Sequence, residues 1–519
     1  MVFRSVYSQY LFFLFVTPIF FTGVVSDNAP DNQALWKVLG VSTADIRNVI
    51  SHFCHPVTND KIWVFSDLPH LVKLLRNNVM DHGITLKSGA KLNHTDFERL
   101  IQLDGAELKT CHKLSKKHIN CKNRERMRVH LAFEVFSNNV AVAMRRFFPH
   151  KQEAANFIEL INNCGDILNS RHPVFSSNNP YKVSFGVAQY ETEQINKLME
   201  LFEIICTMKV GRSKSLYPFQ RGFLITINSA IHLLRDLKTT YAECQYILTA
   251  RLNQDYIENF FSLIRGMGEF NMNPNPTETM TRLKSIALSQ NLRHSQYLCV
   301  QNEDSDNENQ TKLASFLFDL EQDKIDNLEC TENFTLQNLS LNSDTWMEYN
   351  SNLTYKESCE LGGQEYVAGF IASKLVSKHP ELALPMKDLE RFPKSWTQQL
   401  SYGNLTVPSP EWVSQFINMD KAFNVFHQKE LGWTELLPLD PDPDVITRLS
   451  AILSSQFNTL PLKLIKSFAK TRTMIRVGHN NKIIKNQPFY NFTAVRTRSH
   501  KSCLPDEMTE EMLNYECSA

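Results

Sequence analysis

Acidic side chains occur at two places where an apolar run of the sequence ends. Asp27 comes at the end of the run IFFTGVV, and Asp67 follows the run WVFS. A carboxylate at the carboxyl end of a buried strand is a common metal ligand or catalytic acid. The alternative for each residue is a cap or turn at the start of the next helix, which Pro69 favours for Asp67.

A second acidic pair lies in the segment LNQDYIENFFSLIR, where Asp255 and Glu258 are spaced i, i+3. On a helix these two carboxylates share one face, while Phe260, Phe261 and Ile264 form the apolar side. Carboxylate oxygens are the ligands that Mg²⁺ prefers, so the pair is a candidate metal site. The alternative is a solvated acidic edge.

Positive charge gathers in two stretches, although the whole chain carries 55 Lys+Arg against 55 Asp+Glu and has no net charge. The segment 109–128 is a basic run, which is either a phosphate-facing surface or a solvated helix face. A second stripe is a candidate for contact with a DNA backbone. It consists of Lys463, Lys466, Lys470, Arg472 and Arg476.

Several common motifs are absent from the sequence. It contains no GxxxxGK[ST], no Gly-x-Ser-x-Gly and no HExxH, so an ordinary P-loop, a hydrolase elbow and a zincin are excluded. None of the eleven cysteines forms a CxxC pair, and their wide spacing is typical of reduced thiols in a cytosolic or nuclear protein.

The apolar and polar residues alternate in a way that indicates several domains in these 519 residues. Over 19–80, short apolar runs alternate with helical stretches, which predicts an α/β arrangement. From about 95 to 240 the pattern is mostly helical, and a further strong helix is expected over 246–266. Residues 301–312 lack apolar side chains and open an acidic linker, and helical periodicity resumes at 364.

The N-terminal stretch leaves two interpretations open. Residues 10–25 could be the apolar part of a secretory signal, or they could run into a buried strand that ends at Asp27. The seven Asn-x-Ser/Thr triplets add little, because chance gives several in a chain this rich in Asn, Ser and Thr. The stretch is short for a membrane span, and Pro18 interrupts it.

Taken in order, several segments resemble the P-element transposase family, including its THAP-domain-containing relatives. They are VVSDNAPDNQALWKVLGVS, VFSDLPHLVKLLRN, HIN at 118–120, FIELINNCGDILNS, LYPFQRGFLI, YILTARLNQDYIENFFSLIRGMGEFNMNPNP, QEYVAGFIASKL and SFAKTRTMIRVGHNNK. The resemblance covers roughly 20–485, and LNQDxxENFFxxIR is its most specific part.

The resemblance implies an α/β RNase H-like domain that cuts and joins DNA with Mg²⁺ or Mn²⁺ held by carboxylates. On that basis Asp27 and Glu258 are expected to be metal ligands, and Asp255 a further catalytic carboxylate one turn earlier. The family's first catalytic Asp belongs on a strand before Asp27, yet the 26 preceding residues contain no Asp or Glu. The THAP zinc domain and a dimerising coiled coil are missing too, so the chain is expected to be truncated at its N-terminus.

The resemblance also implies that a mainly helical insertion interrupts the RNase H-like domain and binds GTP without a P-loop. The matching nucleotide-contact positions are Lys113, Val129, Asn162 and Asp166. An Asp can accept hydrogen bonds from the donors of guanine, and a Lys can pair with phosphate. The alternative for Asn162 and Asp166 is a helix end with a polar face.

These inferences predict an incomplete RNase H-like domain, its GTP-binding-like insertion and a helical C-terminal domain. The expected boundaries are 1–98 and 239–298 for the RNase H-like parts, 99–238 for the insertion, 299–355 for the linker, 356–485 for the C-terminal domain and 486–519 for a tail. The expected function is that of a P-element-type DNA transposase relative, nuclear and catalytically impaired. The alternatives are a domesticated, non-catalytic DNA- and GTP-binding protein, or a secreted glycoprotein if residues 1–25 are a signal peptide. Partners are DNA and a second copy of the chain, with no membrane.

Overall fold

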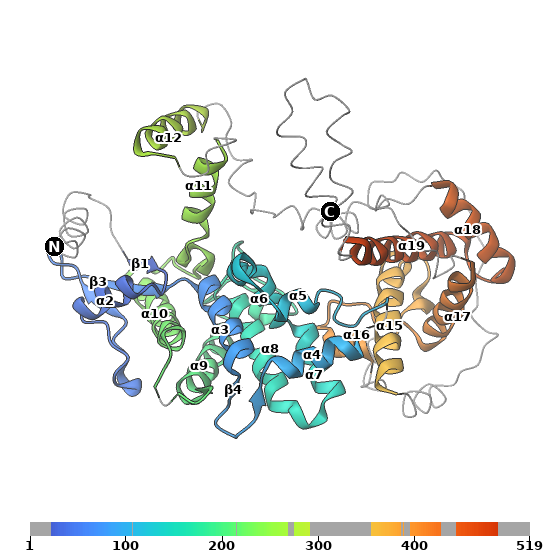
Figure 1. Cartoon of the computed structure of the whole chain (residues 1–519), viewed down its shortest axis with the longest axis horizontal. Helices are drawn as coiled ribbons and strands as arrows, with labels where there is room; N and C mark the ends of the chain where they lie inside the picture. Colours follow the sequence, from blue (N-terminus) through green and yellow to red (C-terminus); the bar gives the residue numbers. More distant parts are fainter. Residues whose placement is uncertain are drawn as a thin grey trace, which may run out of the picture. The chain divides into compact units, whose positions relative to one another are not determined.

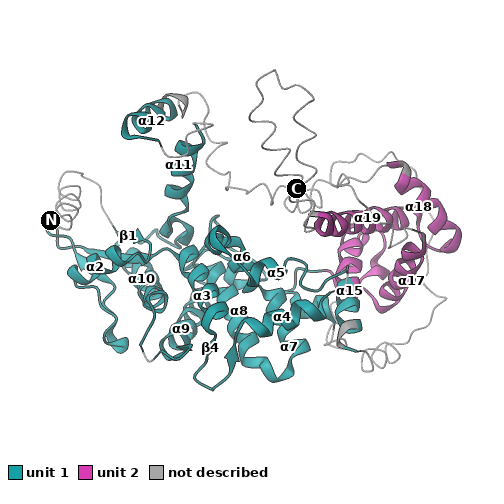
Figure 2. Cartoon of the chain, viewed as in Figure 1, with its two compact units in different colours: residues 1–305, 353–363, 387–405 teal, residues 306–352, 364–386, 406–519 magenta. Residues whose placement is uncertain are grey.

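The computed structural model describes residues 22–105, 107–213, 215–267, 274–290, 354–385, 388, 395–426 and 443–485. Two compact units make up the chain (Figure 2). Unit 1 comprises residues 1–305, 353–363 and 387–405, and unit 2 comprises the remaining residues. The predicted linker lies almost entirely outside the described residues, and the predicted tail 486–519 lies wholly outside them.

Unit 1 contains a three-stranded sheet whose order is β1-β3-β2. Strand β1 (Gly23–Ser26) runs parallel to β3 (Lys61–Ser66), and β2 (His52–Cys54) pairs antiparallel with β3. The run IWVF of β3 is fully buried, as expected for a central strand covered on both faces. The predicted strands that end before Asp27 and Asp67 are confirmed over these residues, whereas residues 1–21 lie outside the described part.

Helices α2 (Pro30–Val38), α3 (Leu68–His82) and α10 (Pro218–Thr240) accompany this sheet (Figure 1). Helix α10 is tied to β3 by hydrogen bonds from Ser66 N to Thr226 Oγ1 (2.9 Å) and from Ser229 Oγ to Val64 O (2.6 Å). A Cβ atom at Gly222 would lie 2.6 Å from Leu71 Cδ2, so a larger residue there would force neighbouring side chains to move. Helix α10 therefore packs on the sheet, although it falls within the predicted insertion 99–238.

The mainly helical part between α3 and α10 confirms the expected helical character of this region. Its longer helices are α4 (His94–Leu103), α6 (Val129–Val135), α7 (Asn138–Phe147), α8 (Gln152–Ile167) and α9 (Glu191–Thr207). The helical pattern of 128–148 is broken between α6 and α7. A small sheet of order β5-β4-β6 joins β4 (Ile84–Thr85), β5 (Lys91–Leu92) and β6 (Lys209–Val210).

After α10 the chain returns to the end of the first sheet. Helix α11 (Asp255–Gly266) is followed by α12 (Pro276–Gln290). The helix expected over 246–266 begins only at Asp255, because residues 249–252 form the short 3₁₀ segment η5 (Thr249–Leu252). Asn253, the residue before the N-cap Gln254, accepts a hydrogen bond from Asp255 N (3.1 Å).

Unit 2 is helical, as the sequence predicts for the C-terminal domain. Helix α15 (Tyr355–Leu375) leads into this part, which continues with α17 (Pro410–Phe426), α18 (Pro443–Gln456) and α19 (Leu462–Lys485). Phe416 and Phe468 meet edge to face with ring centroids 5.1 Å apart in its core. Among the described residues of the whole chain, no helix combines the length and the apolar character that a membrane crossing needs.

Candidate functional site

Asp27 lies at the carboxyl end of β1 and already forms local hydrogen bonds. Its Oδ1 atom accepts from Ala29 N (3.0 Å) and from Asn32 Nδ2 (2.6 Å) at the start of α2. The turn that the sequence left open as an alternative is therefore present. The half-buried carboxylate nevertheless stays at the strand end, where the sequence placed it.

Asp67 occupies the equivalent place at the end of the neighbouring parallel strand β3. It is only 3% exposed, and its Oδ2 atom accepts a hydrogen bond from His70 N (3.0 Å), which confirms the expected cap of α3. Its Oδ1 atom accepts from Gln254 N (2.8 Å), immediately before α11. Burial raises the pKa of Asp67 to about 6, and the charges of Glu258 and Asp255 act in the same direction.

The contact between Asp67 and Gln254 was missed in the sequence, where Asp67 stood only as a candidate strand-end carboxylate or cap. The sequence did contain a signal that Asp67 belongs to the same site as Asp27, since each of these two acidic residues directly follows a strand. Parallel strands place their carboxyl ends at one edge of the sheet, and the structure puts β1 beside β3.

Lys73 is a buried positive charge whose pKa is raised by three of these carboxylates. It lies in α3, is 5% exposed, and its Nζ atom is 3.3 Å from His70 Nδ1. Burial lowers the pKa of Lys73, while the charges of Glu258, Asp67 and Asp27 raise it. Asp27 and Glu258 thus act on the same ammonium group although they are far apart in the sequence.

The described residues do not fit a ready-made divalent metal site. Nowhere in the described ranges do three or more His, Cys, Asp or Glu side chains form a group that could hold a metal ion. The charges of Asp27 and Glu258 already act on the ammonium group of Lys73, and Asp255 accepts a hydrogen bond from Arg171 Nη2 (2.9 Å). The predicted metal ligands Asp27 and Glu258 therefore stay a prediction.

Of the four predicted nucleotide-contact residues, two lie one turn apart on α8. Asn162 accepts a hydrogen bond from Asn138 N (3.2 Å) and donates one to Asn163 Oδ1 (3.3 Å). The Oδ2 atom of Asp166 is buried, and none of the residues that the structure describes donates a hydrogen bond to it. Burial raises the pKa of Asp166 to about 6, and the charge of Lys182 opposes that shift.

The other two predicted residues lie near α6. Val129 is its first residue, and the charge of Lys113 acts on Glu134 in the same helix. Asn162 is bonded to Asn138, which begins α7 directly after α6. The four positions therefore lie on, or just before, the three consecutive helices α6, α7 and α8. Of the four side chains, Asp166 is the one with a buried oxygen to which no described residue donates a hydrogen bond.

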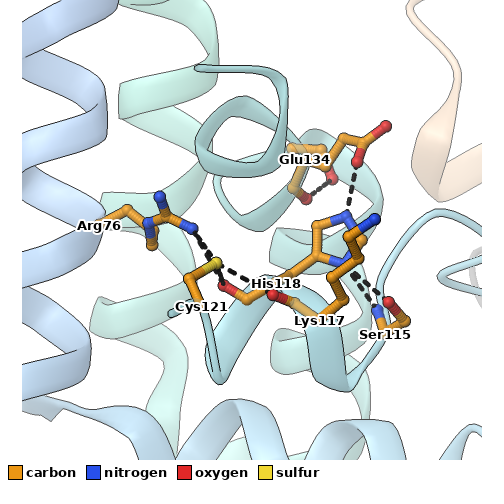
Figure 3. A network of polar contacts seen from close by, with 7 residues as sticks. Arg76, Ser115, Lys117, His118, Cys121 and Glu134 are labelled. Atoms are coloured by element: carbon orange, nitrogen blue, oxygen red, sulfur yellow. Dashed lines mark hydrogen bonds and ion pairs between the residues drawn. The ribbon is translucent and has the colours of Figure 1, made fainter. Parts of the chain in front are cut away.

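The segment HIN at 118–120 belongs to a polar network that holds a basic loop against α3 and α6 (Figure 3). His118 Nε2 is 2.6 Å from Glu134 Oε2, and Ser115 N donates to His118 Nδ1 (3.1 Å) at the start of α5 (Lys116–Ile119). Buried Arg76 donates through Nη1 to Cys121 Sγ (2.6 Å). The segment 118–120 therefore has a structural role, because its contacts hold the chain between Lys113 and Val129 in place.

The basic stripe of unit 2 is only partly available to a ligand. Lys463 and Lys466 of α19 are exposed, and Lys470 is half-buried. Arg472 and Arg476 are each 2% exposed. The prediction that these two arginines contact DNA therefore disagrees with the structure.

The two arginines are instead part of the core of unit 2. Arg472 Nε is 2.5 Å from Asp420 Oδ1, and Arg476 donates to Asn424 Oδ1. Both guanidinium groups lie over the ring of Phe423, at 4.8 and 4.5 Å from its centroid. Helical spacing alone had grouped Arg472 with the exposed lysines. Its side chain nevertheless points inward, because the buried carboxylate of Asp420 pairs with it.

Comparisons with known proteins agree with these elements. Residues 69–181 match the family model of the TNP-like, GTP-binding insertion domain, and residues 251–278 match that of the TNP-like, RNase H C-terminal domain. The first covers α4 to α8, and the second covers α11 with Asp255 and Glu258. The chain thus has the domain combination of a transposase-like protein with a GTP-binding insertion.

Individual relatives point to the same class. The chain is 30% identical to the Transposable element P transposase of Drosophila melanogaster over 478 residues, which cover 89% of this chain and 58% of that protein. It is 26% identical to the DNA transposase THAP9 of Homo sapiens over 259 residues, covering 47% and 28% respectively. The chain is thus similar to P-element transposases over most of its own length.

A solved structure is also similar. The Drosophila P element transposase strand transfer complex aligns with a TM-score of 0.49 and 31% identity, covering 56% of this chain and 64% of that one. The chain spans less than two thirds of the length of each of these relatives.

Proposed function

We propose that the chain binds GTP through its insertion and that Asp166 accepts hydrogen bonds from the guanine base. The single observation that carries this proposal is the buried Oδ2 atom of Asp166, which has no hydrogen-bond partner within the described part of the chain. A buried acceptor without a donor is costly, and guanine offers N–H donors at N1 and N2. The match to a GTP-binding insertion domain supports the same ligand.

The phosphates of GTP are proposed to bind near Lys113 and Val129. Lys113 supplies a compact positive charge suited to a phosphate oxygen, and Val129 contributes the backbone at the start of α6. Asn162, one turn before Asp166, adds an amide that can donate or accept.

A calorimetric titration of the full chain with GTP tests this proposal, with ATP as the competing nucleotide. We expect GTP to bind more tightly than ATP, because adenine lacks the two guanine donors. Asp166→Asn should weaken GTP binding by about 10- to 100-fold, since a hydrogen bond to a charged group contributes about 1.5–3 kcal/mol. Glu153→Gln, in the first turn of the same helix, is the control and should leave the affinity unchanged. Equal affinities for GTP and ATP would contradict the assignment of Asp166.

We further propose that the chain acts on DNA in the nucleus as a relative of strand-transferring transposases. The observation that favours this is that Asp27 and Asp67 follow two paired parallel strands, and that Asp67 accepts a hydrogen bond from Gln254 N at the start of the helix that carries Glu258. Mg²⁺ or Mn²⁺ is the expected ion for Asp27 and Glu258, with Asp255 one turn earlier on α11. We propose that this 519-residue chain does not cut DNA by itself, because the buried ammonium group of Lys73 already supplies positive charge to Asp27 and Glu258.

Purified chain incubated with nicked or hairpin DNA, GTP and Mg²⁺ or Mn²⁺ tests the second proposal. The expected result is binding without cleavage. Cleavage that disappears in Glu258→Ala would overturn the proposed impairment and establish Glu258 as catalytic. Binding without cleavage is also what a domesticated DNA- and GTP-binding protein would show, and that is the alternative function.

A further inference from the structure

The chain segment that follows α8 is joined to the segment that precedes α11 by buried hydrogen bonds. Ser170 N donates to Thr249 Oγ1 (3.0 Å), and Thr249 N donates to Ser170 Oγ (3.2 Å). Thr249 Oγ1 also donates to Ile167 O (2.6 Å), the last residue of α8. Ser170 is 7% exposed and Thr249 is 1% exposed, so this junction is shielded from water.

Two further contacts extend the junction to the first turn of α11. Asn253 Nδ2 donates to Asn169 Oδ1 (3.2 Å). Arg171 Nη2 donates to Asp255 Oδ2 (2.9 Å), which forms an ion pair between side chains that are 41% and 31% exposed. The residues just after α8 therefore contact the first residue of α11 through an ion pair.

The start of α11 is also held by Asp67, the residue that follows β3. Gln254 N donates to Asp67 Oδ1 (2.8 Å), and Glu258 N donates to Gln254 O (2.9 Å) within the helix. The position of Glu258 thus depends on a turn that both Asp67 and Arg171 contact.

We propose that Arg171 is a positioning residue that couples nucleotide occupancy at Asp166 to the first turn of α11, and hence to Glu258. This inference rests on the proposed binding of GTP. Asp166 and Ile167 are the last two residues of α8, so a ligand that restrains Asp166 also restrains the helix end from which the junction starts. Coupling is reciprocal, so removal of the Arg171–Asp255 contact must also change the affinity for GTP.

Hydrogen exchange of the amides 255–266, measured on the full chain with and without GTP, tests the coupling. In the wild-type chain GTP should slow this exchange. Arg171→Gln should speed exchange about two- to fivefold without nucleotide, remove most of the effect of GTP and weaken GTP binding by a similar factor. Arg171→Lys keeps the positive charge and should restore part of the effect of GTP on the exchange of 255–266. A side chain of similar size without the charge should not restore it.

Arg145→Gln is the matched control. Arg145 pairs with Glu159 of α8 at 2.5 Å with side chains 33% and 32% exposed, which is close to the exposure of the Arg171 pair. It should leave the exchange of 255–266 unchanged, because this pair does not reach α11.

The outcomes separate the two proposals. If the wild-type chain does not bind GTP, the proposed function is overturned, and the coupling falls with it. If GTP binds but leaves the exchange of 255–266 unchanged, only the coupling is overturned. An Arg171→Gln chain that responds to GTP as the wild type does would also overturn it.

Discussion

The Oδ1 atom of Asp67 accepts a hydrogen bond of 2.8 Å from the backbone nitrogen of Gln254. This contact ties the end of β3 to the start of α11 across the whole helical insertion. The other carboxylate oxygen caps α3 through His70 N. One buried side chain therefore fixes two helix starts on the edge of the sheet where Asp27 also lies.

Replacement of Asp67 should destabilise unit 1. We expect Asp67→Ala to lower the free energy of unfolding by about 2–4 kcal/mol, because a helix cap is lost and the amide of Gln254 loses its acceptor. Denaturant unfolding followed by circular dichroism measures this change. Asp45→Ala is the control, since Asp45 caps an exposed 3₁₀ turn through Arg47 N, and it should cost about 1 kcal/mol or less. Equal losses in the two variants would show that the Gln254 contact adds nothing.

Asp166 should make stability depend on pH. Its pKa is about 6 in the folded chain because of burial, against 3.8 for the ordinary side chain. A raised pKa means that the unfolded chain loses this proton at lower pH than the folded chain. The contribution of Asp166 is therefore fully present below pH 4 and is lost as the pH rises through 6.

Asp166→Asn should remove this loss. Above pH 6 the variant should be more stable than the wild type by about 1–3 kcal/mol, while its affinity for GTP falls. Denaturant unfolding of both proteins between pH 4.5 and pH 8 gives the difference at each pH. A difference that does not change with pH would mean that the Asp166 carboxyl is not the titrating group.

Arg472 should be needed for the fold of unit 2 and not for contact with DNA. Arg472→Ala leaves Asp420 buried without its partner, so we expect a loss of about 3–5 kcal/mol in the free energy of unfolding. Thermal unfolding measures this loss. Lys466→Ala, an exposed position on the same helix, is the control and should change stability by no more than about 0.5 kcal/mol.

The exposed lysines of α19 should carry whatever DNA contact this helix makes. If Lys463 and Lys466 meet phosphates, each change to Ala should lower the slope of log affinity against log salt by about one. Fluorescence anisotropy with a DNA duplex at several salt concentrations measures the slope. An unchanged slope in the double variant would remove the stripe from the DNA interface.

The strand and helix pattern around the site could be predicted from local residues. The residues Trp, Val and Phe before Ser66 are aromatic or β-branched, which favours the strand that the structure confirms. Asp67 and Pro69 mark the start of α3, which the structure also confirms. The helix at Asp255 was predicted too, but its start was placed too early. The residues before it form a 3₁₀ turn held by Thr249, whose partner Ser170 lies far away in the sequence.

Local residue patterns were enough to predict the alternation of strands and helices near the N-terminal end and the resemblance to a GTP-binding insertion. They could not predict that Asp67 meets Gln254 or that Arg472 turns inward to Asp420, nor that Asp166 has a buried oxygen to which no described residue donates. The physical reason is that periodicity reports which face of an element is apolar. The partner of a polar group and its access to water depend instead on segments that only folding brings together.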